Sequence, residues 1–270
     1  MQTLLNNLRA ARARAYVRVI GTNRELSWLV FDILLPVLSI SAYIFIYKAI
    51  GAPEEYGGYV IIGGVMTGFW LNVLWNMGAN WYWEKQTGNL EIFFLAPISR
   101  LSILGGMAVG GMFQTSIRAM STAVLGALIF RIPMQVAHPF GALVAFVLTL
   151  VALYGLGAMF ASLFLLYGRE AWHYANLLQE PIYLLSGFYF PVRALGFWVA
   201  VGASVIPLTL GLDAMRQLVY PHHGMGLLPV GVELAILAGL CALYVGMAGA
   251  ALRTMENLAR REGRLTLKWQ

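Results

Sequence analysis

The segment from Trp83 to Arg100, WEKQTGNLEIFFLAPISR, differs from the chain around it. It holds four charged residues, a glycine and a proline, and it lies between two long apolar runs. Pro97 cannot continue a helix and biases Ala96 to an extended conformation, and the pair Thr87 and Gly88 marks a break. The segment therefore predicts a short helix with an apolar face, which the bilayer, the helix bundle or another protein has to cover.

Composition places the whole chain in a membrane. Hydrophobic residues make up 60% and charged residues 11%, against about 45–50% and about 25% in soluble domains. The apolar residues form runs of the length that a membrane-spanning helix needs, and the alternation of a β-barrel is absent. We therefore expect an all-α integral membrane protein with six spans, at residues 28–50, 59–81, 101–130, 139–167, 171–190 and 227–252.

Two terminal segments flank the six-helix domain expected over residues 27–252. The segment 1–26 carries Leu4, Leu8, Ala11, Ala15 and Val19 at three- and four-residue steps, with four arginines around them. This pattern predicts a basic amphipathic helix in the membrane interface, the alternative being a disordered basic tail. A removed signal peptide is not indicated, and residues 253–270 are expected to form a basic cytoplasmic tail.

The positions of lysine and arginine predict the orientation of the spans. With the amino terminus in the cytoplasm, most basic residues fall on that side. They are Arg9, Arg12, Arg14, Arg18, Arg24, Lys85, Arg100, Arg169, Arg253, Arg260, Arg261, Arg264 and Lys268. We therefore expect a multi-pass protein of the inner or plasma membrane with both termini cytoplasmic. The net charge of +6 reflects this bias and an attraction to anionic membrane lipids, not nucleic-acid binding.

The sequence offers little material for a chemical site. The single cysteine, Cys241, excludes an internal disulfide and a thiolate metal cluster. The adjacent His222 and His223 are expected to be loop residues, and no metal site is predicted. The glycine clusters lack the Gly-Lys-Ser/Thr ending of a phosphate-binding loop, so we expect no nucleotide site in this chain.

Residues 84–99, EKQTGNLEIFFLAPIS, resemble a known pattern. In the inner-membrane permeases of type-2 ABC exporters, the cytoplasmic loop between spans two and three reads Glu-Lys/Arg-x-x-Gly-x-Leu-Glu-x-Leu-x-x-x-Pro-Val/Ile-Ser. Phe93 stands at the second leucine position, where it still presents an apolar side chain.

A second resemblance lies near the carboxyl end. Ser186, Gly187 and Pro191, followed by Pro207 and Arg216, are similar to the outer-side signature of the same permeases. There the chain turns and forms a short re-entrant pair of helices, expected here at about residues 187–215. Gly196 replaces a proline that is common in the family and makes the turn less rigid. The two motifs, in order and on the predicted sides, identify the chain as a member of this family.

The resemblance implies a permease that forms half of a dimer with a second copy or a paralogous permease. It also implies two copies of a separate cytoplasmic ATP-binding subunit, which would bind the ATP and Mg, so this chain is not expected to be an enzyme. In the family the helix after span two, here about residues 84–97, docks on that subunit. The corresponding coupling residues are Glu84, Lys85, Gly88, Leu90, Glu91, Phe93 and Pro97.

Ionisable residues within the spans are further candidates, since charge at membrane depth is costly. Arg118 and Glu180 are each expected near the middle of the bilayer, either as a static ion pair or in contact with cargo. Trp70 and Trp75 are candidates to line a cavity, although interfacial belts are the usual place for tryptophan. Asp32 is expected near the inner end of the first span, as a cap or beside Arg24.

The cargo class follows only in outline. Short outer loops argue against a large periplasmic extension. The spans offer no dense row of hydrogen-bonding residues for a long sugar chain, which favours an amphiphile, such as a drug, a lipid or a lipid-linked glycan, with a polysaccharide exporter as the alternative. A membrane-embedded enzyme would need convergent catalytic groups, and His173, Glu180 and Arg118 are too sparse for that. A secondary transporter would show more spans or an inverted repeat.

Overall fold

The computed structural model describes residues 2–22, 26–133, 136–167, 170–221 and 226–261. In this part of the chain all regular structure is helical, with no strand. The elements follow in the order α1 (Gln2–Thr22), α2 (Leu26–Ala49), α3 (Glu55–Leu71), the π-helix η1 (Asn72–Gly78), α4 (Asn80–Gln86), α5 (Asn89–Leu95), α6 (Arg100–Phe130), α7 (Pro139–Tyr167), α8 (Ala171–Leu185), the 3₁₀-helix η3 (Val192–Leu195), α9 (Phe197–Ala203), α10 (Pro207–Val219) and α11 (Val230–Arg261). The predicted all-α fold is confirmed for these residues.

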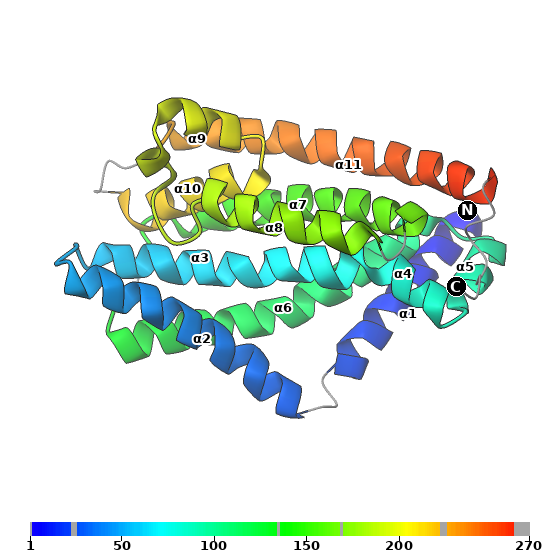
Figure 1. Ribbon diagram of the computed structural model, residues 1–270, viewed down its shortest axis with the longest axis horizontal. Helices are drawn as coiled ribbons and strands as arrows, with labels where there is room; N and C mark the ends of the chain where they lie inside the picture. The colour runs from blue at the N-terminus through cyan, green and yellow to red at the C-terminus, as the bar shows by residue number, and fades with distance from the viewer. Residues whose placement is uncertain (1, 23–25, 134–135, 168–169, 222–225, 262–270) are drawn as a thin grey trace.

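The long helices lie side by side along the long axis of the molecule, with the short helices at its two ends (Figure 1). One end carries α4 and α5, together with the start of α1 and the end of α11. The opposite end carries α9, α10 and the connection between α2 and α3. We call these the α5 end and the α10 end.

Within the described residues, four helical stretches are long and apolar enough to cross a membrane: Glu55–Gln86, Arg100–Phe130, Pro139–Phe164 and Val230–Leu258. A fifth is possible if α9 and α10, which meet at 113°, are counted as one broken span. The apolar part of α2, Ile33–Ala49, is shorter. The chain is thus a multi-pass membrane protein, whereas the full set of six spans remains a prediction.

The predicted fifth run, residues 171–190, is helical only to Leu185. Gly187 has a φ of +62°, a left-handed conformation that stops the helix and that glycine adopts without steric cost. At 15 residues α8 is about 22 Å long, less than the hydrocarbon thickness of about 30 Å. The expected length of this run was wrong because the apolar residues after Leu185 form a loop and do not continue the helix.

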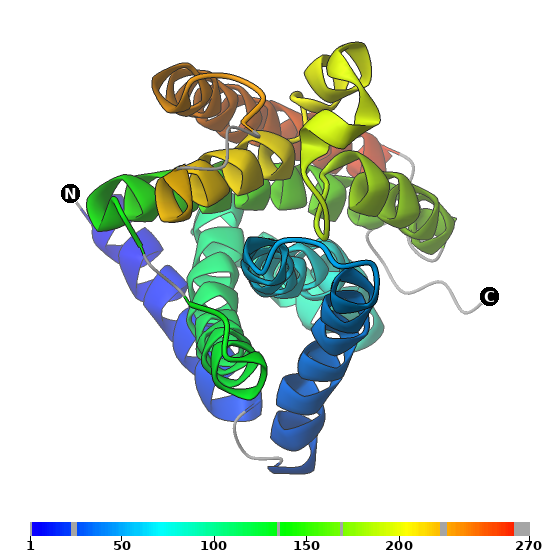
Figure 2. The same ribbon diagram turned by 90° about the vertical axis from the view of Figure 1, so that its left-hand side faces the viewer.

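The core forms around α3 and η1, which the other helices surround. Trp70, Phe69 and Met66 of α3 are completely buried. Figure 2, which looks along the molecule from the α10 end, shows α3 flanked by α2, α6 and the layer of α7, α8 and α10. Close packing is possible because α3 carries glycines at its contacts: a methyl group on Gly63 would collide with the carbonyl oxygen of Phe188.

The amino-terminal helix α1 packs along α6 with only part of the stripe that the sequence pattern predicted. Ala11 and Ala15 lie against Gly106 and Gly110 of α6, so closely that a methyl group on either glycine would meet the α1 backbone. Leu4 and Leu8, which were expected on the same apolar stripe as these alanines, are instead exposed. Ala11 and Ala15 therefore face the bundle, because only small side chains permit this approach. Most of the large apolar residues of α1 are exposed: Leu4, Leu5, Leu8, Tyr16, Val17 and Ile20.

Candidate functional site

The predicted break in the segment Trp83–Arg100 lies between α4 and α5. Gly88 has a φ of +76°, a left-handed value, and α5 begins at the next residue. The helix ends at Leu95, where Ala96 is extended with φ −69° and ψ +139°, as expected before Pro97. The boundaries of this short helix therefore agree with those predicted from Gly88 and Pro97. The expected extent of the coupling helix, about residues 84–97, was too long, because residues 84–86 belong to α4.

Glu84 joins three helices at the α5 end. Its carboxylate is buried, forms an ion pair with Arg14 of α1, and accepts a hydrogen bond of 3.1 Å from the Asn89 side chain at the start of α5. Ser99, which precedes α6, donates its backbone N–H to Asn7 of α1 at 2.8 Å. Glu84 thus fixes α4 and α5 to α1 and does not face outward.

The two faces of α5 have different surroundings. Leu90 is 1% exposed, and Phe93 is half-buried between the Trp81 ring, with centroids 6.4 Å apart, and the Arg14 guanidinium, 4.9 Å from its ring centre. Ile92 and Leu95, on the other face, are 63% and 86% exposed. Among the described side chains of α5, Ile92 and Leu95 are therefore the apolar ones available to a partner, whereas Leu90 and Phe93 hold the helix on the bundle.

Three other candidate coupling residues lie around this helix. Lys85 is half-buried near the end of α4, and Pro97 is exposed after the end of α5. Glu91 belongs to α5, but its side chain lies outside the described residues, as does that of Phe94. The coupling roles assigned to all these residues remain predictions.

At the α10 end, a buried arginine organises the motif predicted there. The Arg216 guanidinium, 1% exposed, donates to the carbonyl oxygens of Gly187 at 2.8 Å, Phe188 at 2.7 Å and Phe190 at 3.1 Å, and to that of Tyr59 in α3 at 3.1 Å. One side chain thus donates hydrogen bonds to three carbonyl groups of this turn and to one of α3. Arg216 therefore ties the loop after α8 to α3 and α10.

The remaining residues of this motif have structural positions around that arginine. Ser186 is completely buried, Pro191 is extended at the start of η3, and Pro207 is the first residue of α10, where proline suits a helix. The expected pair of short helices is present as α9 and α10. Their insertion into the membrane is a proposal that we take up below.

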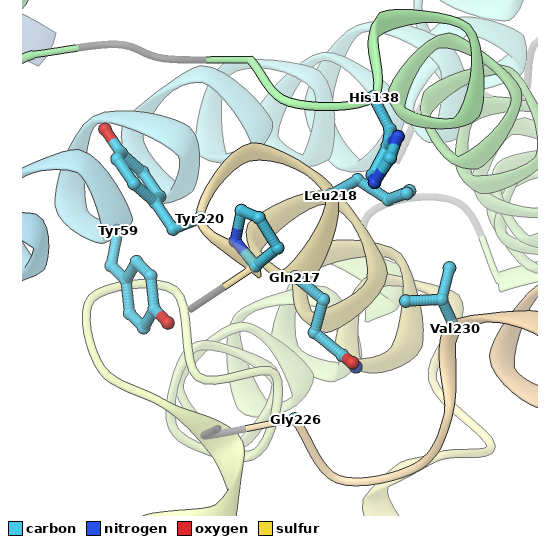
Figure 3. A pocket seen from close by; sticks show the side chains of 8 residues that line it. Tyr59, His138, Gln217, Leu218, Tyr220, Gly226 and Val230 are labelled. Carbon is cyan, nitrogen blue, oxygen red and sulfur yellow. The ribbon is translucent and has the colours of Figure 1, made fainter. Parts of the chain in front are cut away.

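A second buried polar group lies beside α10, and no pattern in the sequence predicted it. The Gln217 amide donates to Asp213 at 3.2 Å and to Glu233 of α11 at 3.1 Å, while the backbone N–H groups of Leu227 and Leu228 donate to the same two carboxyl groups. Gln217 borders a cavity of about 240 Å³ together with His138 and Tyr220, and its side chain points toward Gly226 (Figure 3). This group joins α10 to the start of α11.

The two ionisable candidates within the spans have different neighbours. Arg118 is half-buried on α6, which packs on α1, α2 and α3, and it lies near Arg18. Glu180 is exposed on α8, which packs on α7 and α9, and it accepts a long hydrogen bond of 3.4 Å from Gln179. Their pairing remains a prediction.

The two tryptophan candidates also differ. Trp70 is completely buried in the core, with its ring edge-on to Phe160. Trp75 of η1 is half-buried, stacks on Trp172 with centroids 5.0 Å apart, and donates to the Gln179 side chain at 3.0 Å. Trp75 thus joins the π-helix to α8, and of the two it is the one nearer the surface of the bundle.

Some residues named in the sequence analysis lie outside the described residues, either entirely or with their side chain. These are His222, His223, Arg24, Arg169 and the side chain of Asp32. Among the residues that are described, no group of three or more histidine, cysteine, aspartate or glutamate side chains could hold a metal ion. Cys241 is buried and donates to the backbone of α7.

Comparison with family models identifies the family of this chain. Residues 12–220 fit the family model described as "ABC-2 type transporter". The match runs from α1 to the end of α10, so it includes both the α5 segment and the Arg216-bound loop. No curated protein matches the chain.

Proposed function

Because the chain belongs to the ABC-2 type transporter family, whose members are membrane permeases, we propose that it is the membrane-spanning half of an ATP-driven exporter. ATP would be bound and hydrolysed by a separate cytoplasmic subunit, of which a complete transporter carries two copies. The other half of the pathway would come from a second copy of this chain or from a paralogous permease.

The observation that carries this proposal is the arrangement of α5. A helix that transmits movement from the ATP-binding subunit needs an outer face that contacts this subunit and an inner face that is fixed to the membrane helices. Exposed Ile92 and Leu95 offer the first, an apolar patch of the kind that forms the centre of protein contacts. Leu90, Phe93 and the Arg14–Glu84 ion pair supply the second.

The proposed orientation follows from the same element. If the ATP-binding subunit docks on α5, the α5 end is cytoplasmic, and with it the start of α1 and the end of α11. The basic residues near these helix ends suit that side of an inner or plasma membrane. The α9–α10 pair, bent by 113°, would then enter the membrane from the outer side as a re-entrant element.

We propose an amphiphilic cargo, either a drug, a lipid or a lipid-linked glycan, and a polysaccharide as the alternative within the same family. The support is the apolar character of the helices and the small number of polar side chains on them. A membrane-embedded enzyme or a secondary transporter would not need an adjacent gene for an ATPase with a Gly-x-x-x-x-Gly-Lys-Ser/Thr loop. The presence of such a gene therefore favours the exporter, and its absence favours one of the other two classes.

The experiment is co-purification with such an ATPase, followed by measurement of ATP turnover with candidate lipids and drugs. Replacing Ile92 and Leu95 together by serine should lower stimulated turnover at least tenfold, since it removes the apolar contact. Gln86→Ala, an exposed change at the end of α4, is the matched control and should leave turnover unchanged. Unaltered stimulation in the Ile92→Ser/Leu95→Ser variant would refute docking through this face.

A further inference from the structure

A carboxylate without a counter-charge lies on the outer side of α8. Glu180 is exposed, and among the described residues its hydrogen-bond partner is the neighbouring Gln179, at a long 3.4 Å. In the described part of the chain it forms no ion pair with a basic side chain. Glu180 is therefore an accessible acidic group that these residues do not neutralise.

Glu180 lies at the depth of the hydrocarbon core. The adjacent Gln179 accepts a hydrogen bond of 3.0 Å from Trp75, which belongs to the apolar stretch Glu55–Gln86. That stretch of 32 residues is about 48 Å long, and Trp75 lies about 7 Å from its middle, well inside the half-thickness of about 15 Å. A charged carboxylate at this depth is costly unless a cation or a water-filled space accompanies it.

Three tyrosine side chains gather near this carboxylate. Tyr43 of α2 and Tyr183 of α8 are both close enough to Glu180 to interact with it electrostatically. Tyr43 stacks on Tyr189, in the loop after α8, with ring centroids 4.0 Å apart and an angle of 13° between the planes. Tyr43 is 38% exposed, so part of its ring is accessible from outside the bundle. We call Tyr43, Tyr183 and Tyr189 the tyrosine cluster.

The tyrosine cluster is held in place by contacts of its own. It connects α2 with α8, two helices that flank α3 (Figure 2). Tyr47 donates to the backbone carbonyl of Tyr189 at 2.9 Å, and the Tyr183 ring lies edge-on to Phe188 with centroids 5.2 Å apart. Because these contacts position the rings before a ligand arrives, binding costs less conformational entropy.

The combination of a carboxylate with aromatic rings favours a cation. The face of an aromatic ring attracts a cation within about 6 Å, and several rings together form the usual site for a quaternary ammonium group. An anion would be repelled by Glu180, and an uncharged sugar would leave this carboxylate without a counter-charge.

Apolar side chains lie on both sides of Glu180 along α8. Leu177 precedes it by three residues and Leu184 follows it by four, so both share its face of the helix. They are 72% and 57% exposed. A ligand that contacts Glu180 therefore also contacts apolar surface.

We propose that Glu180 and the tyrosine cluster bind the cationic group of an amphiphile, whose apolar part lies along Leu177 and Leu184. The positive charge lies against the Glu180 carboxylate and the face of the Tyr43 ring. In the exporter this site would select a positively charged amphiphile as cargo. That last step rests on the proposed function, whereas the binding itself does not.

The test compares two lipophilic ions of the same size and shape but opposite charge. The full chain, in nanodiscs of phosphatidylcholine, is titrated with tetraphenylphosphonium and with tetraphenylborate, and binding is measured by calorimetry with empty nanodiscs as the reference. We expect one tetraphenylphosphonium per chain, and tetraphenylborate bound at least about tenfold more weakly.

Two variants and a matched control locate the site. Glu180→Gln should weaken tetraphenylphosphonium binding about tenfold or more, because it removes the counter-charge. Glu170→Gln removes the same charge from an exposed position just before α8 and should change binding less than about twofold.

Tyr43 tests the aromatic part of the site. Tyr43→Phe keeps the ring and should change tetraphenylphosphonium binding less than about threefold, whereas Tyr43→Leu removes the ring and should weaken binding about fivefold or more. This pair of variants carries the test if Glu180→Gln does not fold.

Three outcomes would overturn the assignment. Equal binding of the two ions would show a purely apolar surface, and equal losses in Glu170→Gln and Glu180→Gln would show a diffuse attraction of charge. Unchanged tetraphenylphosphonium binding in Glu180→Gln, together with dissociation of two copies of the chain, would make Glu180 part of a contact between permeases.

This proposal and the proposed function can fail separately. If lipids or uncharged drugs stimulate ATP turnover of the complex but tetraphenylphosphonium does not bind, the exporter stands and the cationic cargo is refuted. If tetraphenylphosphonium binds but no ATPase co-purifies, the site stands and the exporter is refuted. If both hold, tetraphenylphosphonium should stimulate ATP turnover of the wild-type complex and not that of Glu180→Gln.

Discussion

The α5 end and the α10 end each attach a short element to the bundle through an arginine, partly buried in the case of Arg14 and buried in the case of Arg216, but with different partners. Arg216 donates to four main-chain carbonyl groups. Arg14 binds a single carboxylate, that of Glu84, and lies over the Phe93 ring. Main-chain partners cannot be altered by substitution and fix a loop rigidly, whereas a pair of side chains makes a joint that can shift. The α10 end is therefore built as a fixed base, and the α5 end as a connection suited to transmit movement.

The largest effect is expected from Arg216→Met. The variant leaves four buried carbonyl groups without a donor, and each such group costs about 1–3 kcal/mol. We expect destabilisation of at least about 4 kcal/mol, measured as loss of folded protein in detergent and a lower unfolding temperature. Arg216→Lys keeps the charge but not the planar array of donors, so it should recover only part of the loss. If Arg216→Met were as stable as the wild type, the claim that Arg216 fixes the loop at the α10 end would be contradicted.

Two adjacent glycines of α6 test the attachment of α1. Gly106→Ala should push α1 from α6 and cost about 1–3 kcal/mol, because the added methyl group meets the Ala11 backbone. At Gly105 no atom lies within 4 Å of the added methyl group, so Gly105→Ala should be neutral or stabilise by up to about 1 kcal/mol. Thermal unfolding of both variants checks this, and a loss of equal size in both would show that helix contact is not the cause.

Glu84→Gln should have a smaller effect on folding than Arg216→Met, about 1–3 kcal/mol, since it leaves the Arg14 charge partly buried. It should nevertheless lower ATP turnover of the complex strongly, because α5 loses its fixed position. Unfolding of Glu84→Gln, Arg14→Gln and the double variant gives the coupling energy of the pair, which we expect to be at least about 0.5 kcal/mol. Strictly additive losses would mean that the ion pair does not stabilise the joint.

The smallest change in stability is expected for Leu95→Ser. Leu95 is 86% exposed, so its replacement should stay within about 0.5 kcal/mol of wild type. Leu90→Ser, five residues earlier and on the inner face, should cost about 2–5 kcal/mol because it replaces a buried apolar side chain. Chemical unfolding of the two variants shows directly which face of α5 packs on the bundle.

The local features of the α5 segment were predictable because they depend on the backbone of single residues. A glycine permits the left-handed break at position 88, and a proline forces the extended residue at position 96. Four of the six predicted runs coincide with helical stretches long and apolar enough to cross a membrane, since the length of such a run can be read from composition alone. The motif resemblance also agreed with the family match over residues 12–220.

The sequence alone could not predict which face of each helix packs on the bundle and which face is exposed. Both Phe93 and Leu95 are apolar, and only the positions of Trp81 and Arg14 decide that the first is covered and the second exposed. Likewise the small residues of α1 face the bundle because α6 presents glycines there.

The sequence by itself thus determined the class of the protein, the break at Gly88 and the end before Pro97 in the α5 segment, and the family to which the chain belongs. The tertiary structure decided where the charged side chains lie: Glu84 in an ion pair, Arg216 on four carbonyl groups, and Glu180 near Tyr43 and Tyr183. The physical reason is that breaks and apolar lengths are local properties of the chain. Burial and pairing, in contrast, depend on residues that only folding brings together.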